Sequence, residues 1–178
     1  MNGYEQELFA QRTPYLQWLK RQDAALDMRY GQHLKQGALG KQIHTLPFSS
    51  CMDNIQIPGE LRDDGIGLFV REGGALSRYA QAVFSDTFLA SPDVVLAYAD
   101  EDYRGSLGEL YGIGGATGAE ETVGAPWFKP DFSPDTLASF FYIGSVFAVR
   151  GSQILETAER YGSDISIYEM VCRIFMEA

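Results

Sequence analysis

A single stretch of 25 residues, from Pro126 to Arg150, constrains the fold of this chain more than any other. Its first part, residues 126–134, interleaves prolines with carboxylates and aromatic residues. Proline inside a helix lacks a backbone donor and clashes with the preceding turn, so this part is predicted to be extended. The following run, Phe140–Val149, is rich in aromatic and β-branched residues, which favour a buried strand. The stretch therefore predicts a proline-braced loop that leads into a core strand.

Other apolar runs predict further strands. Gly65–Val70 and Val94–Ala99 are apolar without alternation, which is typical of strands buried on both faces. Ile43–Phe48 is a shorter candidate. Apolar residues at helical spacing predict helices over residues 75–89, 152–161 and 166–177, and one helical turn over 135–138. Glycines and acids from Gly105 to Gly124 predict a loop. Strands that alternate with helices predict an α/β protein with a small mixed sheet.

The N-terminal part of the chain is predicted to be helical. Residues 4–39 carry an apolar stripe that is interrupted at Thr13-Pro14, where Thr13 can cap a second helix and Pro14 can occupy its first position. We expect an N-terminal helical segment over residues 1–40 and an α/β domain over 41–178, in a chain that is one compact domain overall.

Composition narrows the functional classes. The chain has 178 residues and a formal net charge of −10. An acidic chain without a basic patch is not suited to nucleic acid or to anionic membranes. No apolar run approaches the ~18 residues of a membrane span. A signal peptide is not visible, so a cytoplasmic location is predicted, with Cys51 and Cys172 as reduced, buried thiols.

Three acids follow the predicted strand at Val94–Ala99. They are Asp100, Glu101 and Asp102. Ligands of open α/β sheets bind beyond the carboxyl ends of strands, and an Asp-X-Asp pair offers hard oxygen ligands that suit Mg²⁺ or Mn²⁺. The alternative interpretation is a solvated turn with acids near the start of a helix.

This acidic run and the stretch Pro126–Arg150 together resemble the central part of a GT-A-type inverting glycosyltransferase domain (family 2-like), which uses nucleotide-diphosphate sugars. In that family a strand ends in an acidic cluster, and a Phe-Lys-Pro-Asp-aromatic-Ser-Pro-Asp segment and a Tyr-Ile-Gly strand follow. Tyr15-Leu-Gln-Trp-Leu-Lys also matches a helix with Tyr-X-X-Trp that precedes the catalytic domain in some members. The resemblance implies a reduced GT-A-like fold and transfer of a sugar, with inversion, to a glycan or other hydroxyl acceptor in polysaccharide biosynthesis.

The resemblance also implies roles for individual residues. The segment that lines the active-site cleft supplies four candidates for substrate binding: Trp127, Lys129, Asp131 and Asp135. Aromatic rings beside carboxylates suit sugars, although a loop whose aromatic residues fill the core is the alternative. Mg²⁺ or Mn²⁺ at Asp100 and Asp102 would neutralise the departing diphosphate. Arg71 stands where the family's principal Asp-X-Asp is expected, so it is either a contact to the diphosphate or an exposed surface arginine.

Inversion requires a carboxylate that takes the proton of the acceptor hydroxyl. The matching region, Tyr161–Arg173, offers Asp164 as the first candidate for this catalytic base and Glu169 as the second. The alternative is that Ser163 or Asp164 caps the last helix.

One part of the family's domain has no counterpart. Fewer than twenty residues connect Phe48 to Gly65, where a complete GT-A domain has further strands and helices that hold the base and ribose. Three possibilities follow: a glycosyltransferase with a shortened nucleotide half, which a protein partner can complete; a non-catalytic carbohydrate-binding or protein-interaction module on a degenerate scaffold; or an unrelated small α/β domain.

Overall fold

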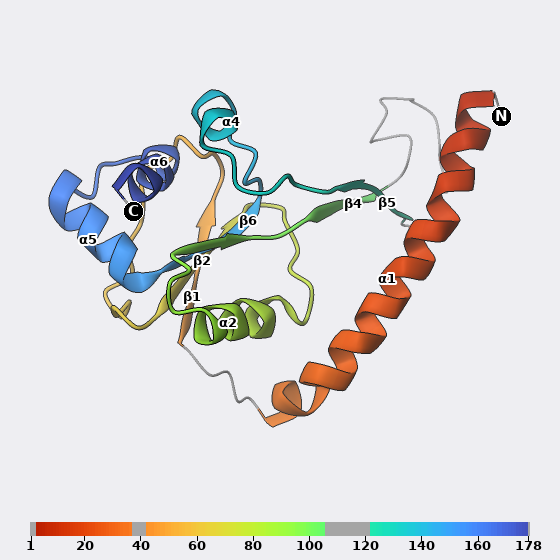
Figure 1. The fold of residues 1–178 in the computed structure, drawn as a ribbon, viewed down its shortest axis with the longest axis horizontal. Helices are drawn as coiled ribbons and strands as arrows, with labels where there is room; N and C mark the ends of the chain where they lie inside the picture. The colour runs from red at the N-terminus through yellow and green to blue at the C-terminus, as the bar shows by residue number, and fades with distance from the viewer. Residues whose placement is uncertain (1–2, 37–41, 106–121, 178) are drawn as a thin grey trace. The chain divides into compact units, whose positions relative to one another are not determined.

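The computed structural model describes residues 3–36, 42–105 and 122–177 (Figure 1). The chain divides into two compact units. Unit 1 comprises Met1–Gln32 and Asp100–Phe128, and unit 2 comprises His33–Ala99 and Lys129–Ala178. The segment that begins at Asp100 therefore belongs with the N-terminal helix, although it interrupts the sequence of unit 2. The boundary expected at residue 40 remains a prediction.

Unit 2 contains a four-stranded mixed sheet in the order β1-β2-β6-β3. These strands are β1 (Ile43–Phe48), β2 (Ile66–Arg71), β3 (Leu96–Tyr98) and β6 (Val146–Arg150). β1 is parallel to β2, whereas β6 is antiparallel to both β2 and β3. The predicted mixed α/β sheet is confirmed, and β1 has the expected bounds.

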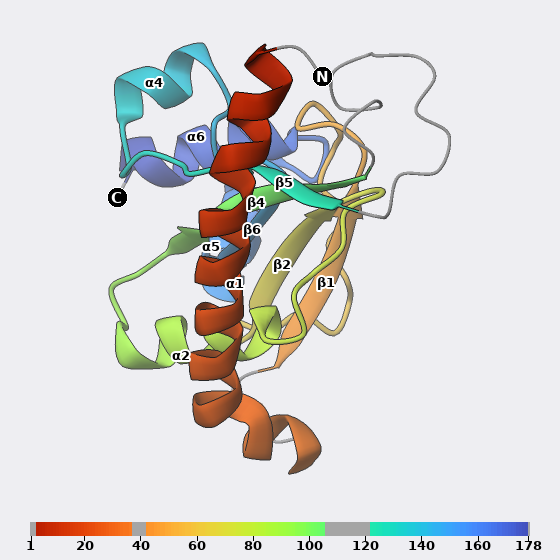
Figure 2. The same ribbon diagram turned by 90° about the vertical axis from the view of Figure 1, so that its right-hand side faces the viewer.

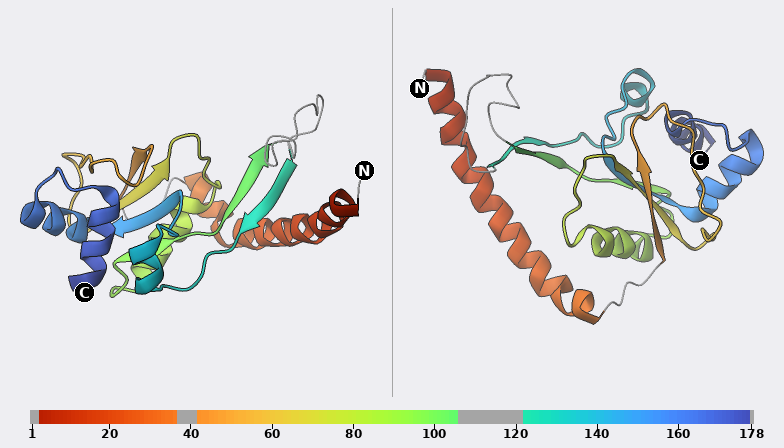
Figure 3. Two further views of the ribbon diagram at one scale, coloured as in Figure 1. Left: turned by 90° about the horizontal axis from the view of Figure 1, so that it is seen from above. Right: turned by 180° about the vertical axis from the view of Figure 1, so that it is seen from behind.

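Helices cover both faces of this sheet, as Figures 1 and 3 show. The helices are α2 (Ala80–Ala90), α5 (Gly151–Tyr161) and α6 (Ile167–Glu177). On one face, Ile66 and Leu68 of β2 form a cluster with Phe88 of α2. On the other face, Phe69 stacks on Phe147 of β6 with ring centroids 4.7 Å apart, in the same cluster as the buried residues of α5 and α6.

Burial of β2 on both faces explains why its apolar residues do not alternate with polar ones. Four consecutive residues of the strand, Ile66–Phe69, are buried. Full burial of a large apolar side chain contributes about 1.5–3 kcal/mol to folding, so this strand is a major source of stability.

Unit 1 contains α1 up to Gln32 and a two-stranded sheet. α1 (Gly3–Gln36) runs through Pro14 without a break (Figure 2), so the predicted interruption there is wrong. A proline already has a helical φ, so a helix can continue through it when tertiary context compensates for the lost hydrogen bond. Among the residues that the structure describes, no helix combines the length and apolar character needed to cross a bilayer.

The two strands of unit 1 were not predicted. β4 (Glu101–Gly105) pairs antiparallel with β5 (Thr122–Trp127), and Glu101 lies opposite Trp127. Both strands are short and lack an apolar alternation, so the predicted loop from Gly105 to Gly124 is wrong at its two ends. The loop's centre, residues 106–121, lies outside the described residues.

The predicted strand at Phe140–Val149 is too long at its N-terminal end, because β6 begins at Val146. The preceding residues form turns, in which the Tyr142 N–H donates to the Phe140 carbonyl at 2.8 Å and Gly144 has a φ of 87°. A glycine is favoured at position 144 because the turn requires a left-handed φ there. Close approach of another backbone within a strand is not the reason.

The interval between β1 and β2 is short and irregular. Residues 49–65 form turns and one isolated bridge, from Asn54 to Ser166, and they contain neither a helix nor a strand. The chain therefore passes from β1 to β2 through turns alone.

Candidate functional site

The candidate site in unit 2 is the edge of the sheet where the parallel strands β1, β2 and β3 have their carboxyl ends. The Glu72 N–H donates to the Phe48 carbonyl at 2.8 Å, which joins the ends of β1 and β2. The Arg71 N–H donates to the Ser145 carbonyl at 2.8 Å, which joins the end of β2 to the turn before β6. The side chains of Arg71 and Glu72 are exposed at this edge, where α/β sheets bind ligands.

A turn fixed by Asp53 follows β1 at the same edge. Its Oδ2 accepts hydrogen bonds from the Ser49 N–H at 2.8 Å, the Ser49 hydroxyl at 2.9 Å and the Ser50 N–H at 2.8 Å. The backbone bonds from Ser50 and Ser49, followed by the Ser49 hydroxyl, lower the pKa of Asp53. The sequence analysis missed this residue, although serines placed shortly before an aspartate are a signal for such a turn.

The loop at residues 129–133 is part of the predicted substrate-binding segment and is held within unit 2 by three hydrogen bonds. The Lys129 Nζ donates to the Ile143 carbonyl at 2.6 Å, and the Tyr98 hydroxyl donates to the Pro130 carbonyl at 2.6 Å. The Ser133 N–H donates to the Tyr142 hydroxyl at 2.8 Å. These bonds define the conformation of the loop and leave the Asp131 side chain exposed.

The bonds of Lys129 qualify its predicted role. One of its ammonium donors is directed at a backbone carbonyl of the turn that also accepts from Arg71. The Lys129 ammonium group and the Arg71 backbone N–H thus donate to two carbonyls of the same turn, those of Ile143 and Ser145.

The loop leads into α4 (Pro134–Ser139), with Phe132 near the end of the loop and Asp135 in the helix. Asp135 lies in the first turn of α4, where a carboxylate favours the positive end of the helix dipole, and it is exposed. Ser133 caps this helix by accepting a bond from the Thr136 N–H. Phe132 stacks on Phe175 of α6 with centroids 4.0 Å apart. The predicted helical turn is confirmed, and it has a structural cap beside the candidate acid.

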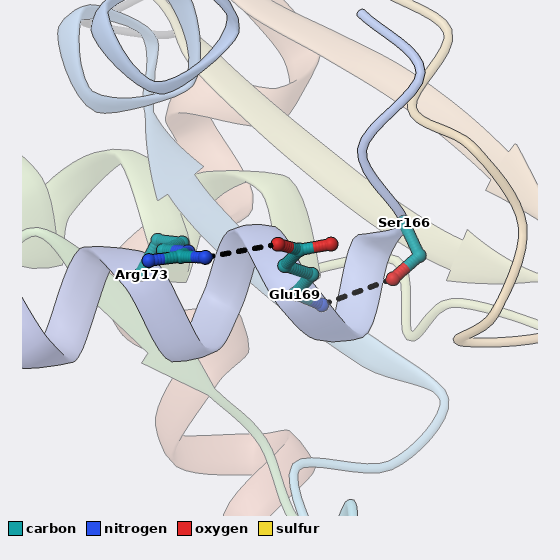
Figure 4. Close-up of polar contacts among 3 residues, drawn as sticks. All are labelled: Ser166, Glu169 and Arg173. Atoms are coloured by element: carbon teal, nitrogen blue, oxygen red, sulfur yellow. Dashed lines mark hydrogen bonds and ion pairs between the residues drawn. The ribbon is translucent and has the colours of Figure 1, made fainter. Parts of the chain in front are cut away.

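The second candidate base, Glu169, has a structural position at the start of α6, as Figure 4 shows. The Ser166 hydroxyl accepts from the Glu169 N–H at 3.1 Å, and the Glu169 carboxylate pairs with Arg173 at 3.2 Å. Ser166 therefore supplies the capping oxygen, and the interpretation of Ser163 or Asp164 as the cap is wrong. Asp164 lies exposed in the turn before the helix.

The remaining donors at the start of α6 are also bonded. The Ile167 N–H donates to the Asp53 carbonyl at 2.9 Å, and the Tyr168 N–H donates to the Cys51 carbonyl at 2.7 Å. Helix N-termini bind anions through unpaired N–H groups. These groups instead attach α6 to the turn after β1, so they are committed to the fold.

The predicted metal ligands and Trp127 lie in unit 1. Asp100 is exposed and directly precedes β4, and Asp102 lies within that strand. The Asp102 Oδ2 accepts from the Tyr15 hydroxyl of α1 at 3.1 Å. Within the described residues, no three His, Cys, Asp or Glu side chains are grouped as a metal site. Two carboxylates remain chemically suited to Mg²⁺, which is commonly held by one or two of them together with phosphates and waters.

The sequence-predicted residues therefore divide between the units. Unit 2 places three of them along the carboxyl edge and its loop, and three beside α4 and α6. The first three are Arg71, Lys129 and Asp131. The second three are Asp135, Asp164 and Glu169. Unit 1 contains Asp100, Asp102 and Trp127.

Comparison with known proteins identifies one informative relative. Over 139 residues, 75% of this chain, the sequence is 32% identical to the O-antigen biosynthesis protein RfbC of Myxococcus xanthus. The chain spans about 10% of the length of that protein. No protein-family profile matches the chain, and no solved structure shows a significant match.

Proposed function

We propose that this chain is a carbohydrate-handling domain of polysaccharide biosynthesis with a reduced GT-A-like architecture. The observation that carries the proposal is the carboxyl edge of the mixed sheet, where the Arg71 backbone N–H and the Lys129 ammonium group bond to two carbonyls of one turn. Sheets of this kind bind ligands at that edge. The 32% identity to an O-antigen biosynthesis protein supports the same biological process.

The specific reaction that we propose is transfer of a sugar from a nucleotide-diphosphate donor with inversion. The acceptor oxygen forms a bond to the anomeric carbon while the bond from that carbon to the diphosphate breaks. Asp164 takes the hydroxyl proton as general base, and Glu169 is the second candidate. The exposure of Asp164 supports this order, because the Glu169 carboxylate is paired with Arg173.

The other proposed roles follow the charges of the side chains. Arg71 contacts the diphosphate, and Lys129 adds positive charge at the same turn. Asp131, Asp135 and Trp127 contact sugar rings and hydroxyls. Asp100 and Asp102 would hold Mg²⁺ or Mn²⁺, which neutralises the charge of the leaving diphosphate when bound.

Isothermal titration of the full chain with UDP-, GDP- and dTDP-sugars, with and without Mn²⁺, tests the donor. Binding of one donor is expected, with about tenfold weaker affinity for Arg71→Ala because a charge-assisted hydrogen bond is lost. Loss of the Mn²⁺ effect in Asp100→Asn and Asp102→Asn would support the metal site. No heat with any donor would contradict the transfer reaction.

A second candidate is a non-catalytic carbohydrate-binding or protein-interaction module on the same scaffold. The turns at residues 49–65 favour it, because they replace the elements that hold a nucleotide in a complete domain. Glycan-array binding without any response to nucleotide sugars would select this module. A nucleotide response that appears only with a co-purified protein would instead indicate a partner that supplies the missing elements.

A further inference from the structure

Unit 1 contains an aromatic cluster formed by Tyr15 and Trp18 of α1 and by Phe128, which follows β5. The Tyr15 and Trp18 rings are stacked with centroids 5.8 Å apart and an interplanar angle of 18°. The Phe128 ring meets both edge-on, at 6.4 Å from Tyr15 and 6.0 Å from Trp18. Despite these contacts, Trp18 is 42% exposed and Phe128 is 58% exposed. The cluster therefore presents aromatic surface to solvent.

A carboxylate lies at the border of this aromatic cluster. The Tyr15 hydroxyl donates to the Asp102 Oδ2 at 3.1 Å, so the phenol is both part of the cluster and a hydrogen-bond donor to the acid. Asp102 is exposed. A carboxylate has about four acceptor sites, and one phenol uses one of them. The same surface thus offers apolar ring surface and an oriented acceptor.

We propose that the aromatic cluster and Asp102 form a binding subsite for a neutral pyranose ring of a glycan acceptor. The C–H groups of a sugar pack on aromatic rings, while its hydroxyls donate to a carboxylate. The exposed Asp102 carboxylate repels an anionic sugar, which favours a neutral ring at this surface. Charged residues are depleted from the cores of protein interfaces, so Asp102 also argues against a purely apolar protein partner. The inference rests on the proposed role in carbohydrate handling.

Tryptophan fluorescence of the full chain gives a local readout. The chain has two tryptophans, Trp18 and Trp127, and both belong to unit 1. The probes are methyl glycosides of glucose, galactose, mannose, rhamnose and N-acetylglucosamine, together with a purified bacterial O-polysaccharide. We expect a saturable change in fluorescence emission with at least one probe. In Trp127→Phe the only tryptophan is Trp18, and its contribution to this change should remain.

Matched variants assign the binding surface. Trp18→Ala and Phe128→Ala should weaken binding by about 2- to 10-fold, the range for one lost ring contact. Affinities of these variants are measured with fluorescein-labelled O-polysaccharide, so that loss of a tryptophan does not remove the signal. Phe128→Tyr should retain affinity, and Asp102→Asn should reduce it. Phe140→Ala is the control, because Phe140 is 60% exposed but lies in unit 2.

Three outcomes would overturn the subsite. They are the absence of binding by every probe, an equal loss in the Phe140→Ala control, and full affinity in folded Trp18→Ala and Phe128→Ala. Circular dichroism establishes that the variants are folded. If nucleotide sugars bind and these glycans do not, this inference fails while the proposed transfer reaction remains. If the glycans bind and nucleotide sugars do not, the subsite remains while the transfer reaction fails.

Discussion

Arg150 joins the end of β6 to a segment of unit 2 that lies far earlier in the sequence, Phe88–Val94. Its Nε and Nη2 donate to the Val94 carbonyl at 3.1 and 2.9 Å, and Nη2 also reaches the Ser91 carbonyl at 3.3 Å. The guanidinium lies 5.1 Å from the centroid of the Phe88 ring. One side chain at the end of β6 therefore holds the C-terminal end of α2 and the entry to β3.

Arg150→Ala is expected to lower the free energy of unfolding by about 2–4 kcal/mol, because several backbone carbonyls lose a charged donor at once. The free energy of unfolding of Arg150→Lys should lie between those of the native chain and Arg150→Ala, since lysine retains the charge but not the planar guanidinium group. Urea unfolding followed by circular dichroism measures both. Arg71→Ala is the control and should change stability by less than about 0.5 kcal/mol, because its side chain is exposed. Equal effects of the two alanine variants would contradict this structural role.

Asp53 makes a pH-dependent contribution at the end of β1. Its folded pKa is lowered from the ordinary value of 3.8 by bonds from Ser50 and Ser49. A lowered folded pKa means that the stabilisation is present above 3.8 and is lost as the pH falls through the lower folded value. Asp53→Asn should therefore lose stability at neutral pH and show a shallower decline in acid.

The urea midpoint measured from neutral to strongly acidic pH tests this prediction. Asp164→Asn is the control, because Asp164 lies exposed in a turn. It should retain the acid-dependent decline of the native chain. An unchanged pH profile in Asp53→Asn would show that the three bonds to its carboxylate do not affect folding.

At the scale of elements, α5 depends on a close backbone approach at its first residue. The Gly151 N–H donates to the Gly65 carbonyl at 2.8 Å, and the Ser152 N–H donates to the Asp63 carbonyl at 3.0 Å. A Cβ at position 151 would overlap the Arg62 carbonyl oxygen, which belongs to the backbone. The start of α5 is thereby fixed against the turn before β2.

Gly151→Ala is expected to destabilise unit 2 by about 3 kcal/mol or more, because backbone must move to admit the methyl group. Gly59→Ala is the matched control. A Cβ there meets nothing within 4 Å, so the change should be within about 0.5 kcal/mol. Thermal unfolding of the two variants measures the difference. Similar melting temperatures would show that the close approach at Gly151 is not required.

The elements differ in how far the sequence predicted them. β2 was predicted within one residue because its apolar residues are consecutive and buried, and β1 has the predicted bounds although only Leu46 and Phe48 in it are buried. α2 begins at Ala80 rather than Ala75, and β6 begins at Val146 rather than Phe140. In β6 the aromatic residues at 140–142 suggested a strand, but Tyr142 is buried from a turn, where its hydroxyl accepts a bond from the Ser133 N–H. Burial of aromatic residues does not require a strand.

At the scale of the whole molecule, unit 2 is interrupted by the segment Asp100–Phe128. The ends of this segment are close, because Glu101 pairs with Trp127 and the Tyr98 hydroxyl bonds to the Pro130 carbonyl. Among the residues of this segment that the structure describes, none belongs to the core clusters of unit 2. The four-stranded sheet therefore closes without it.

Replacement of residues 100–128 by a short Gly-Ser linker should leave unit 2 folded, with a cooperative urea transition. The reason is that the buried apolar clusters and the sheet register remain intact, and a short linker adds little closure entropy. Circular dichroism and urea unfolding measure the outcome. A control deletion of β6, residues 146–150, should abolish the transition because it removes a central strand. Loss of the transition in the linker variant would contradict the division into units.

The candidate site was partly predictable for the same reason. Strand ends are local in sequence, so Arg71 and the acids after β3 were found at the ends of apolar runs. Asp53 was missed because its partners are recognised by turn geometry rather than by any apolar pattern. Glu169 bonds to Ser166 through its N–H and pairs with Arg173 through its carboxylate. Both contacts form only once the start of α6 is set.

The sequence by itself determined the α/β class, the buried strands and the short interval between β1 and β2, because hydrophobic periodicity and chain length are local properties. Only the tertiary structure decided the strand order, the antiparallel place of β6 and the grouping of Asp100–Phe128 with α1. These features depend on contacts between residues distant in sequence. The hydrogen bonds of Lys129, Asp102 and Arg150 are set in the same way, since each has a partner that the fold alone brings within reach.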